Sequence, residues 1–299
     1  MTTKKVICFG EVLWDMLPTG KMPGGAPMNV AFHLNNFGLD SAIISRIGTD
    51  DLGDELLDFM NDSGLNTTLV QRGTNHLTGV VKVNMDDKNE VTYKIVQPVA
   101  WDYILLDDEA VKAVEQSDCF VFGSLAARNQ GTRDTLYQLV EKAPFKVFDV
   151  NLREPYYTRE VVEYLLHKTD MVKMNAHELA MITAWYEPLM DEKSAIKKLA
   201  ERYGASTICV TRGGEGAILW QNGEFYESKG FAVEVNDTIG SGDSFLATLI
   251  KGILHNDPPA QNVELACAVG SLVATHRGAT PVITPEAIQE LIATAERVG

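Results

Sequence analysis

The chain has 299 residues, of which 45% are hydrophobic and 22% are charged, a balance typical of a globular protein with a large apolar core. Its 41 acidic and 26 basic side chains give a formal net charge of −15, so we expect no nucleic-acid partner for this acidic surface. No run approaches the roughly 18 consecutive apolar residues that span a bilayer, and we expect no membrane partner.

The cysteines and histidines show no metal-binding spacing. Cys8, Cys119, Cys209 and Cys267 each lie in an apolar run, which predicts reduced, buried thiols. Neither CxxC nor HExxH occurs, so a zinc enzyme is not indicated. The first residues enter a strand-like run without the features of a secretory signal, and we therefore expect a cytoplasmic protein.

Short β-rich runs alternate with amphipathic helical runs, a pattern that predicts one α/β domain over residues 1–299. Its central sheet should be mainly parallel and covered by helices. We expect strands at residues 5–11, 42–47, 119–123, 146–151, 171–174 and 207–211. A helix should begin near Pro27, and further helices are expected at residues 54–64, 195–204 and 241–256, each ending at a glycine or an asparagine.

Two hairpins interrupt this alternation. Residues 78–84 and 90–96 alternate apolar and polar side chains around the turn-forming MDDKN, which predicts an antiparallel hairpin that projects from the main sheet or caps it. Residues 216–230 turn at Asn222-Gly223, a strong hairpin signal, and should close one edge of the sheet.

Two early segments carry hydroxyl-binding groups. Gly24 and Gly25 allow a ligand to approach the backbone closely, and the amide of Asn29 both donates and accepts hydrogen bonds. Asp15 follows Glu11 by four residues after the first strand and can accept bonds from two adjacent hydroxyls. Taken singly, these features also fit a plain turn and a solvated carboxylate.

Further polar residues follow predicted strands. Asn175 and Glu178 are three residues apart at the start of a helix, where they can hold Mg²⁺ through water or simply cap that helix. Thr211 and Gly213 follow a buried strand, at the edge where open α/β sheets bind ligands, although a tight turn fits as well. Arg153 is a cation that also follows a predicted strand, where it can contact a phosphate or form an ion pair at the surface.

The segment of residues 234–254 is the most informative. Gly240, Ser241 and Gly242 expose backbone N–H groups at the positive end of a helix, a site for an anion. Asp243 would repel a passively bound phosphate, so it is placed either to deprotonate an attacking hydroxyl or only to cap the helix. No P-loop motif or dinucleotide-binding glycine fingerprint is present.

The chain closely resembles the ribokinase-like or PfkB carbohydrate kinases over nearly its whole length. The motifs that carry this resemblance are, in chain order, GGAPMNVA, the early hairpin, FDVNLR, NAHE, VTRGGEGA and DTIGSGD. The opening GEVLWD and the later AWDYI look like the bacterial fructokinase branch. The resemblance implies a three-layer ribokinase-like fold with a small β-stranded lid from about residues 12–26 and 78–101. It also implies ATP, Mg²⁺ and K⁺ as cofactors. The wet face of the hairpin at residues 78–96 can pair with a second copy of the chain, so we expect a homodimer formed through the lid.

The resemblance also implies roles for particular residues. Asp243 would be the catalytic base, with Gly240, Ser241 and Gly242 as the anion hole. The sugar-binding residues would be Asp15, Gly25, Asn29, Lys94 and Arg153, and the nucleotide-binding residues would be Asn175, Thr211, Gly213, Gly214 and Gly216. Glu178 would hold Mg²⁺ through water, and K⁺ would be bound by Asp237, Ile239, His276 and Gly278.

The chain departs from the family pattern at three places. Val150 replaces the usual proline of DPN, and Ser241 replaces the usual alanine of GAGD but keeps its backbone amide. Thr92-Tyr93-Lys94 stands where the 2-keto-3-deoxygluconate kinases carry Tyr-Tyr-Arg. The sequence therefore favours a fructokinase, with a kinase of that sugar acid or of another small sugar as the alternative. A sensor without turnover is the alternative of a different class.

Overall fold

A nine-stranded sheet forms the centre of the computed structural model, which describes residues 3–18, 20–85, 91–187 and 190–298. The strands follow the order β13-β12-β11-β10-β9-β8-β1-β4-β5, and only the pairs β11–β12 and β12–β13 are antiparallel. Their bounds are β1 Lys5–Phe9, β4 Asp40–Gly48, β5 Val70–Gly73, β8 Cys119–Gly123, β9 Lys146–Asp149, β10 Met171–Asn175, β11 Thr207–Thr211, β12 Ala217–Gln221 and β13 Glu224–Ser228.

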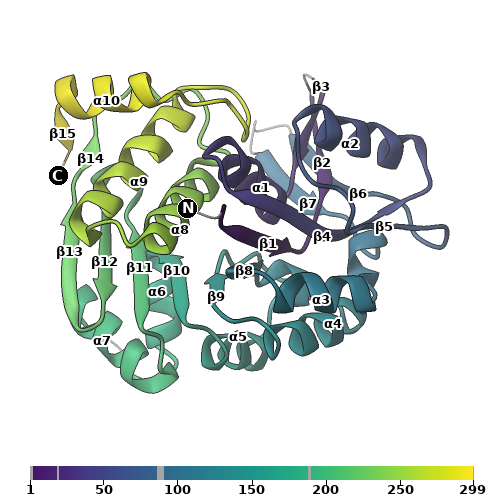
Figure 1. Cartoon of the computed structure of the whole chain (residues 1–299), viewed down its shortest axis with the longest axis horizontal. Helices are drawn as coiled ribbons and strands as arrows, with labels where there is room; N and C mark the ends of the chain where they lie inside the picture. Colours follow the sequence, from purple (N-terminus) through teal and green to yellow (C-terminus); the bar gives the residue numbers. More distant parts are fainter. Residues whose placement is uncertain (1–2, 19, 86–90, 188–189, 299) are drawn as a thin grey trace.

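Helices cover both faces of this sheet, so the fold has the predicted three layers (Figure 1). One face carries α3 Asp108–Glu115, α4 Gln130–Val140, α5 Arg159–His167, α6 Ala176–Thr183 and α7 Glu192–Tyr203. The other carries α1 Ala26–Asn36, α2 Asp51–Asp62, α8 Ser241–His255, α9 Pro259–Ala274 and α10 Pro285–Thr294. A short pair, β14 Gly230–Phe231 and β15 Arg297–Val298, lies beside this second layer.

Alternation along the strands divides the core into two apolar clusters. Ile7 and Phe9 of β1 pack on the side of α3 to α7, whereas Val6 and Cys8 pack on the side of α1, α8 and α9. Successive strand side chains point to opposite faces, so a strand buried on both faces is apolar at every position. The four cysteines are buried and unpaired, as predicted.

All six predicted strands are present, and two are shorter than expected. β1 ends at Phe9 because Gly10 has a φ of 144°, and β9 ends at Asp149 shortly before Asn151, whose φ is 36°. A positive φ takes the backbone out of the extended conformation and ends the strand. The edge strand β5 was not predicted.

The second predicted hairpin is confirmed as β12–β13, with β13 at the edge of the sheet. Its turn residues have positive φ values, 51° at Asn222 and 94° at Gly223, which is the conformation that an Asn-Gly hairpin turn requires.

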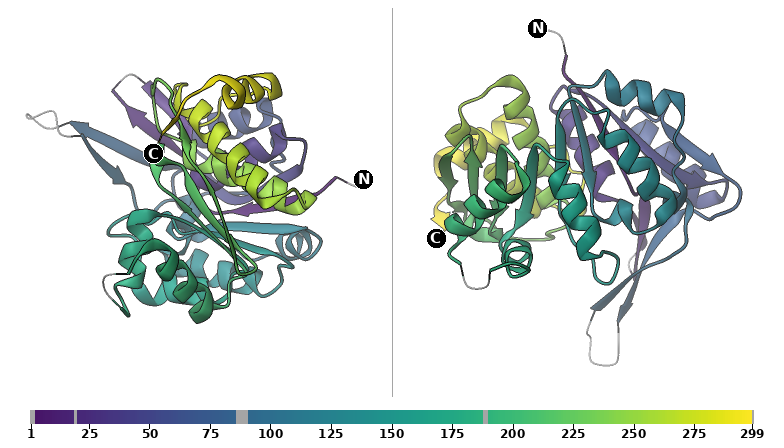
Figure 2. Two further views of the ribbon diagram at one scale, coloured as in Figure 1. Left: turned by 90° about the vertical axis from the view of Figure 1, so that its left-hand side faces the viewer. Right: turned by 90° about the horizontal axis from the view of Figure 1, so that it is seen from below.

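A second, smaller sheet stands apart from the large one. Its strands follow the order β3-β2-β6-β7, with bounds β2 Leu13–Leu17, β3 Gly20–Gly24, β6 Gly79–Met85 and β7 Val91–Ile95. The predicted antiparallel hairpin is β6–β7, and most of its expected MDDKN turn lies outside the described residues. The parallel pairing of β2 with β6 joins two distant segments, and β6 and β7 extend away from the body of the molecule (Figure 2).

Within the described part of the chain, no helix is long and apolar enough to cross a bilayer.

Candidate active site

A cavity of about 350 Å³ opens where the carboxyl ends of β1, β9 and β10 meet the start of α8, and we call it the first cavity. The small sheet contributes Leu13, Asp15, Val81 and Ile95 to its wall, so this sheet lies over the cavity. The remaining lining residues are Glu11, Gly25, Ala26, Asn29, Leu125, Asn151, Arg153, Lys173, Thr238, Ile239, Gly240, Gly242 and Asp243.

Asp243 lies in the first turn of α8 and is buried at the first cavity. Burial, followed by the charge of Asp149, raises the pKa of Asp243 to about 6, while Lys173 and a hydrogen bond from Asn29 act against that rise. The carboxylate is therefore mainly ionised at neutral pH, yet more basic than an ordinary aspartate. This is the state that a general base requires.

Asn29 joins Asp243 to α1. Its Nδ2 donates to Asp243 Oδ2 at 2.8 Å, so the amide nitrogen orients the carboxylate. Its Oδ1 is buried and has no hydrogen-bond partner, which leaves an acceptor at the first cavity. The structure thus places Asn29, which was predicted to bind the sugar, at the first cavity, and shows a contact with Asp243 that the sequence did not indicate.

The glycine-rich turn before α8 requires glycine at Gly240. This residue has a φ of 77°, and a Cβ on it would stand 2.5 Å from the Cα of Ala279. The turn places the free N–H groups of the first helical turn at the cavity. The N–H of Ser241 donates to Thr238 O at 3.3 Å, and the Oγ of Ser241 donates to Gly270 O of α9 at 2.8 Å.

A buried ion pair lies beneath this turn, and the sequence reasoning missed it. Lys173 Nζ contacts both carboxylate oxygens of Asp149, at 3.0 and 3.2 Å. The same Nζ is 3.2 Å from the point where a Cβ on Gly242 would stand, so the ammonium group lies directly under the turn. Burial works to lower the pKa of Lys173, but Asp149 and Asp243 outweigh it and the net shift is upward. A lysine in the otherwise apolar run MVKMN was the available signal.

Asp15 lines the first cavity opposite this turn. Burial, with a smaller contribution from Asp237, raises the pKa of Asp15 to about 6. Gly24 leaves room for it, because a Cβ there would stand 2.5 Å from Asp15 Oδ2. Gly25 has a φ of 117° and lies against the backbone of Glu11, so its conformation requires a glycine.

We expect Asp15→Asn to stabilise the protein at pH 8 by about 1 kcal/mol. The folded pKa, about 6, exceeds the ordinary 3.8, so the folded state holds a proton that the unfolded chain releases at pH 4 to 6. That stabilising contribution is complete below the unfolded pKa and is lost as pH rises through the folded value. Chemical denaturation at pH 8 and pH 4 tests this, and an equal gain at both pH values would contradict it.

A second cavity, of about 490 Å³, lies on the other side of the same turn. Thr211, Gly213, Gly214 and Gly216, which were predicted to bind a nucleotide, all line it, together with Ser241. Its mainly apolar wall, which the sequence reasoning missed, comes from Phe231, Val233, Val235, Phe245, Cys267 and Ala274. Thr238 and Gly242 belong to the lining of both cavities, so the two cavities meet at the start of α8.

Asn175 and Glu178 form a reciprocal helix cap. Asn175 Oδ1 accepts from the Glu178 N–H, and Glu178 Oε2 accepts from the Asn175 N–H at 2.8 Å. Glu178 Oε1 accepts from the Leu152 N–H, and burial raises the pKa of this carboxyl. Asn175 lines a neighbouring depression with Thr211 and Gly213. Each oxygen of Glu178 thus accepts one backbone N–H and keeps a further lone pair as an acceptor.

The described residues contain no group of three His, Cys, Asp or Glu side chains that would ligate a metal ion directly. Of the residues predicted for K⁺, Asp237 accepts from the N–H groups of Ile239 and Gly278, at 3.0 and 3.2 Å. The Asp237 N–H donates to Ala274 O, two residues before His276. The structure therefore brings Asp237, Ile239 and Gly278 together, and His276 lies in the segment that leads to Gly278.

The two predicted carboxylate partners differ in position. Arg153 lines the first cavity from the end of β9. Lys94 is exposed and does not line it, because its neighbour Ile95 faces the cavity and adjacent strand residues point to opposite sides. The structure therefore does not bring Lys94 to the site.

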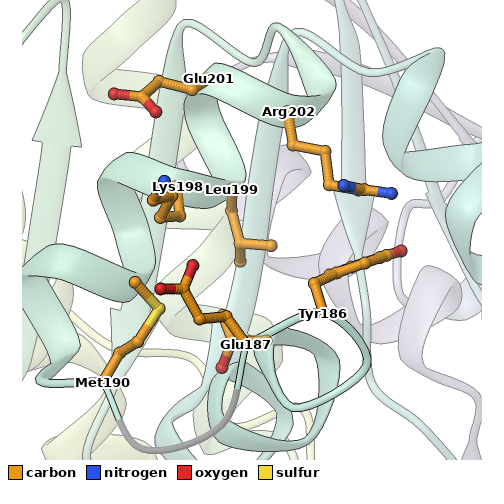
Figure 3. Close-up of a pocket in the computed structure, with 8 residues that line it drawn as sticks. Tyr186, Glu187, Met190, Lys198, Leu199, Glu201 and Arg202 are labelled. Carbon is orange, nitrogen blue, oxygen red and sulfur yellow. The ribbon is translucent and has the colours of Figure 1, made fainter.

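Another pocket, of about 280 Å³, lies between α6 and α7 (Figure 3). The guanidinium of Arg202 lies 3.5 Å from the ring centroid of Tyr186, and the other lining residues include Glu187, Met190 and Lys198. This pocket includes no residue predicted for the site.

Comparisons with known proteins agree with this geometry. A model of the pfkB family carbohydrate kinases matches residues 3–287. The fructokinase of Escherichia coli is 27% identical over 296 residues, which cover 92% of this chain and 94% of that protein.

Solved structures share the fold. The fructokinase with bound ATP from Xylella fastidiosa has a TM-score of 0.85 at 23% identity, and covers 98% of this chain and 99% of its own. The aminoimidazole riboside kinase from Salmonella enterica, complexed with aminoimidazole riboside and an ATP analog, has a TM-score of 0.81 at 22% identity and covers 97% and 100%.

Proposed function

Because the chain belongs to the pfkB family of carbohydrate kinases, we propose that it is a fructokinase that transfers the terminal phosphoryl group of ATP to the 6-hydroxyl of fructose. A member of this family is a phosphotransferase that acts on a sugar hydroxyl. The observation that carries the proposal is the meeting of the two cavities at Thr238 and Gly242, with Asp243 facing the first. The sugar would occupy the first cavity, and the nucleotide the second.

Asp243 would take the proton of the attacking hydroxyl. Asn29 holds its carboxylate in place, and the raised pKa strengthens it as a base. The N–H groups at the start of α8 and the nearby Lys173 would stabilise the negative charge of the phosphoryl group during transfer. The arrangement needs no covalent intermediate on the protein, because the sugar hydroxyl and the terminal phosphoryl group of ATP would meet at the turn before α8.

Mg²⁺ bound with ATP would neutralise phosphate charge, and Asn175 and Glu178 would hold it through water. K⁺ would be held beside the turn by Asp237 and by carbonyl groups near Ile239, His276 and Gly278. These assignments rest on the family resemblance, and they are supported by the contact of Asn175 with Glu178 and by those of Asp237 with Ile239 and Gly278.

The chemistry of the first cavity supports fructose over a sugar acid. Asp15, Asp243 and the free oxygen of Asn29 are acceptors for hydroxyl groups, and the two carboxylates disfavour a carboxylate ligand. Arg153 is the cation that remains to bind a sugar carboxylate, since Lys94 is turned away and Lys173, paired with Asp149, lies under the turn that would bind the phosphoryl group. A 2-keto-3-deoxygluconate kinase, or a kinase for another small sugar, remains the alternative within the family.

Release of ADP, measured with fructose, glucose, mannose, ribose and 2-keto-3-deoxygluconate in turn, tests the proposal. We expect fructose to give the highest kcat/KM, because a site built to bind hydroxyls rejects acceptors that leave its polar groups unpaired. A higher kcat/KM for the sugar acid would replace the fructokinase assignment. Failure to release ADP with any sugar, while nucleotide binding persists, would favour a sensor.

We also propose that the small sheet is a lid that closes over the sugar and excludes water. Its residues Leu13, Val81 and Ile95 supply an apolar cover for the first cavity.

We expect a homodimer formed through these lids in the cytoplasm, because the small sheet has two open edges, β3 and β7, that a second copy can pair with. Light scattering over a range of protein concentrations measures the mass, and a strict monomer would contradict this arrangement.

A further inference from the structure

Glu11 occupies an unusual position at the end of the first strand. Its side chain is only 4% exposed, and it lines the first cavity beside Asp15, Asn29 and Asp243. The backbone packs tightly there, because a Cβ on Gly25 would stand 2.4 Å from Glu11 O. The Glu11 side chain is therefore buried in the wall of the first cavity.

Its carboxyl group lacks a complete set of partners. In the described part of the chain, seven buried side-chain polar atoms have no hydrogen-bond partner, and two of them, Glu11 Oε2 and Asn29 Oδ1, belong to residues that line the first cavity. Leaving such an atom buried and unpaired costs about 1–3 kcal/mol, more when it is charged. A ligand with hydroxyl groups would supply hydrogen-bond donors for these two unpaired acceptors.

Nearby cations do not pair with this carboxyl. Arg128 pairs with Asp102, with Nε–Oδ1 and Nη2–Oδ2 distances of 2.6 and 2.8 Å, and its guanidinium stacks on Trp101, while its third nitrogen, Nη1, is also buried without a hydrogen-bond partner. Arg153 is exposed and donates to Leu152 O. Burial raises the pKa of Glu11 to about 7, Asp243 adds to that rise, and its own N–H, Arg153 and Arg128 oppose it.

We propose that Glu11 is a specificity-determining residue whose free Oε2 accepts a hydrogen bond from a sugar hydroxyl other than the one that Asp243 deprotonates. The assignment rests on the proposed function, since it requires a sugar in the first cavity. Glu11 then adds a third carboxyl group to Asp15 and Asp243, and strengthens the preference for a neutral sugar.

The test uses the acceptor that the ADP-release experiment identifies, together with its deoxy analogues, each lacking one hydroxyl. We expect Glu11→Leu to lower kcat/KM for the intact sugar about 10- to 100-fold, mainly through KM, as for a lost hydrogen bond to a charged group. Glu11→Gln, which keeps an acceptor oxygen, should recover most of the loss. One analogue should be phosphorylated equally well by the wild type and by Glu11→Leu, because it lacks the hydroxyl that Glu11 binds.

An equal loss for the intact sugar and for every analogue would overturn the inference, because it would mean that Glu11 acts only on the shape of the site. Thermal unfolding of Glu11→Leu is the folding control, and its midpoint should not fall. A wild type that phosphorylates a sugar other than fructose overturns the fructokinase proposal and leaves this test intact. A wild type that phosphorylates no sugar overturns both.

Discussion

Asp243→Asn is expected to lower kcat by about 10²- to 10⁴-fold while leaving the affinity for ATP nearly unchanged. Asparagine has almost the shape of aspartate, so it still receives the N–H of Asn29 but cannot take a proton. The second cavity, where the nucleotide would bind, does not include Asp243 among its lining residues. Steady-state kinetics with a titration of ATP binding separate the two effects.

Asp257→Asn is the matched control, because this exposed residue just beyond the end of α8 lies outside both cavities. It should retain wild-type kcat. The wild-type kcat should also fall as the pH drops through about 6, since protonation of Asp243 removes the base. An Asp243→Asn variant that keeps more than a tenth of the wild-type kcat would show that another group accepts the proton.

Local patterns predicted the framework of this molecule. The strands β8 and β11 fall at the predicted residues because apolar runs bounded by turn residues define buried strands, and the Asn222-Gly223 turn is recognisable from two residues. The glycine-rich turn before α8 was likewise visible, because Gly240 and Gly242 lie within four residues of Asp243.

Local sequence patterns did not predict the contacts between segments that are distant in the chain. The pairing of β2 with β6 joins residues more than sixty positions apart, and neither strand specifies its partner. The bond between Asn29 and Asp243 spans 214 residues, so the sequence marked both side chains without indicating that one orients the other. The apolar wall of the second cavity is shared among β14, the segment that follows it, α8 and α9, each of which has the composition of an ordinary packed element.

The ion pair of Lys173 with Asp149 shows why buried charges escape sequence reasoning. Each residue lies in an otherwise apolar strand, and a single charged residue in such a strand does not indicate which residue it pairs with. Its meaning depends on the partner strand, since β9 and β10 are parallel neighbours that pair Lys173 with Asp149 directly. Both side chains are less than 10% exposed.

Lys173→Met is therefore expected to lower the free energy of unfolding by about 3–5 kcal/mol, because it leaves Asp149 buried without its counter-ion. It should also impair catalysis in a characteristic way. Asp149 raises the pKa of Asp243 and Lys173 lowers it, so loss of the lysine moves that pKa further upward. The acid limb of the pH–rate profile should then shift to higher pH, which a purely structural defect would not produce.

The double variant Lys173→Met with Asp149→Leu separates stability from chemistry. Replacing both charges by apolar groups removes the unpaired carboxylate, so most of the stability should return. The kcat should not return, because the ammonium group that lies 3.2 Å from the Cβ position of Gly242 is gone from beneath the phosphoryl-binding turn. Urea unfolding and steady-state kinetics on both variants measure the two quantities. Full recovery of kcat in the double variant would contradict this prediction, because it would show that Lys173 acts only as a counter-ion for Asp149.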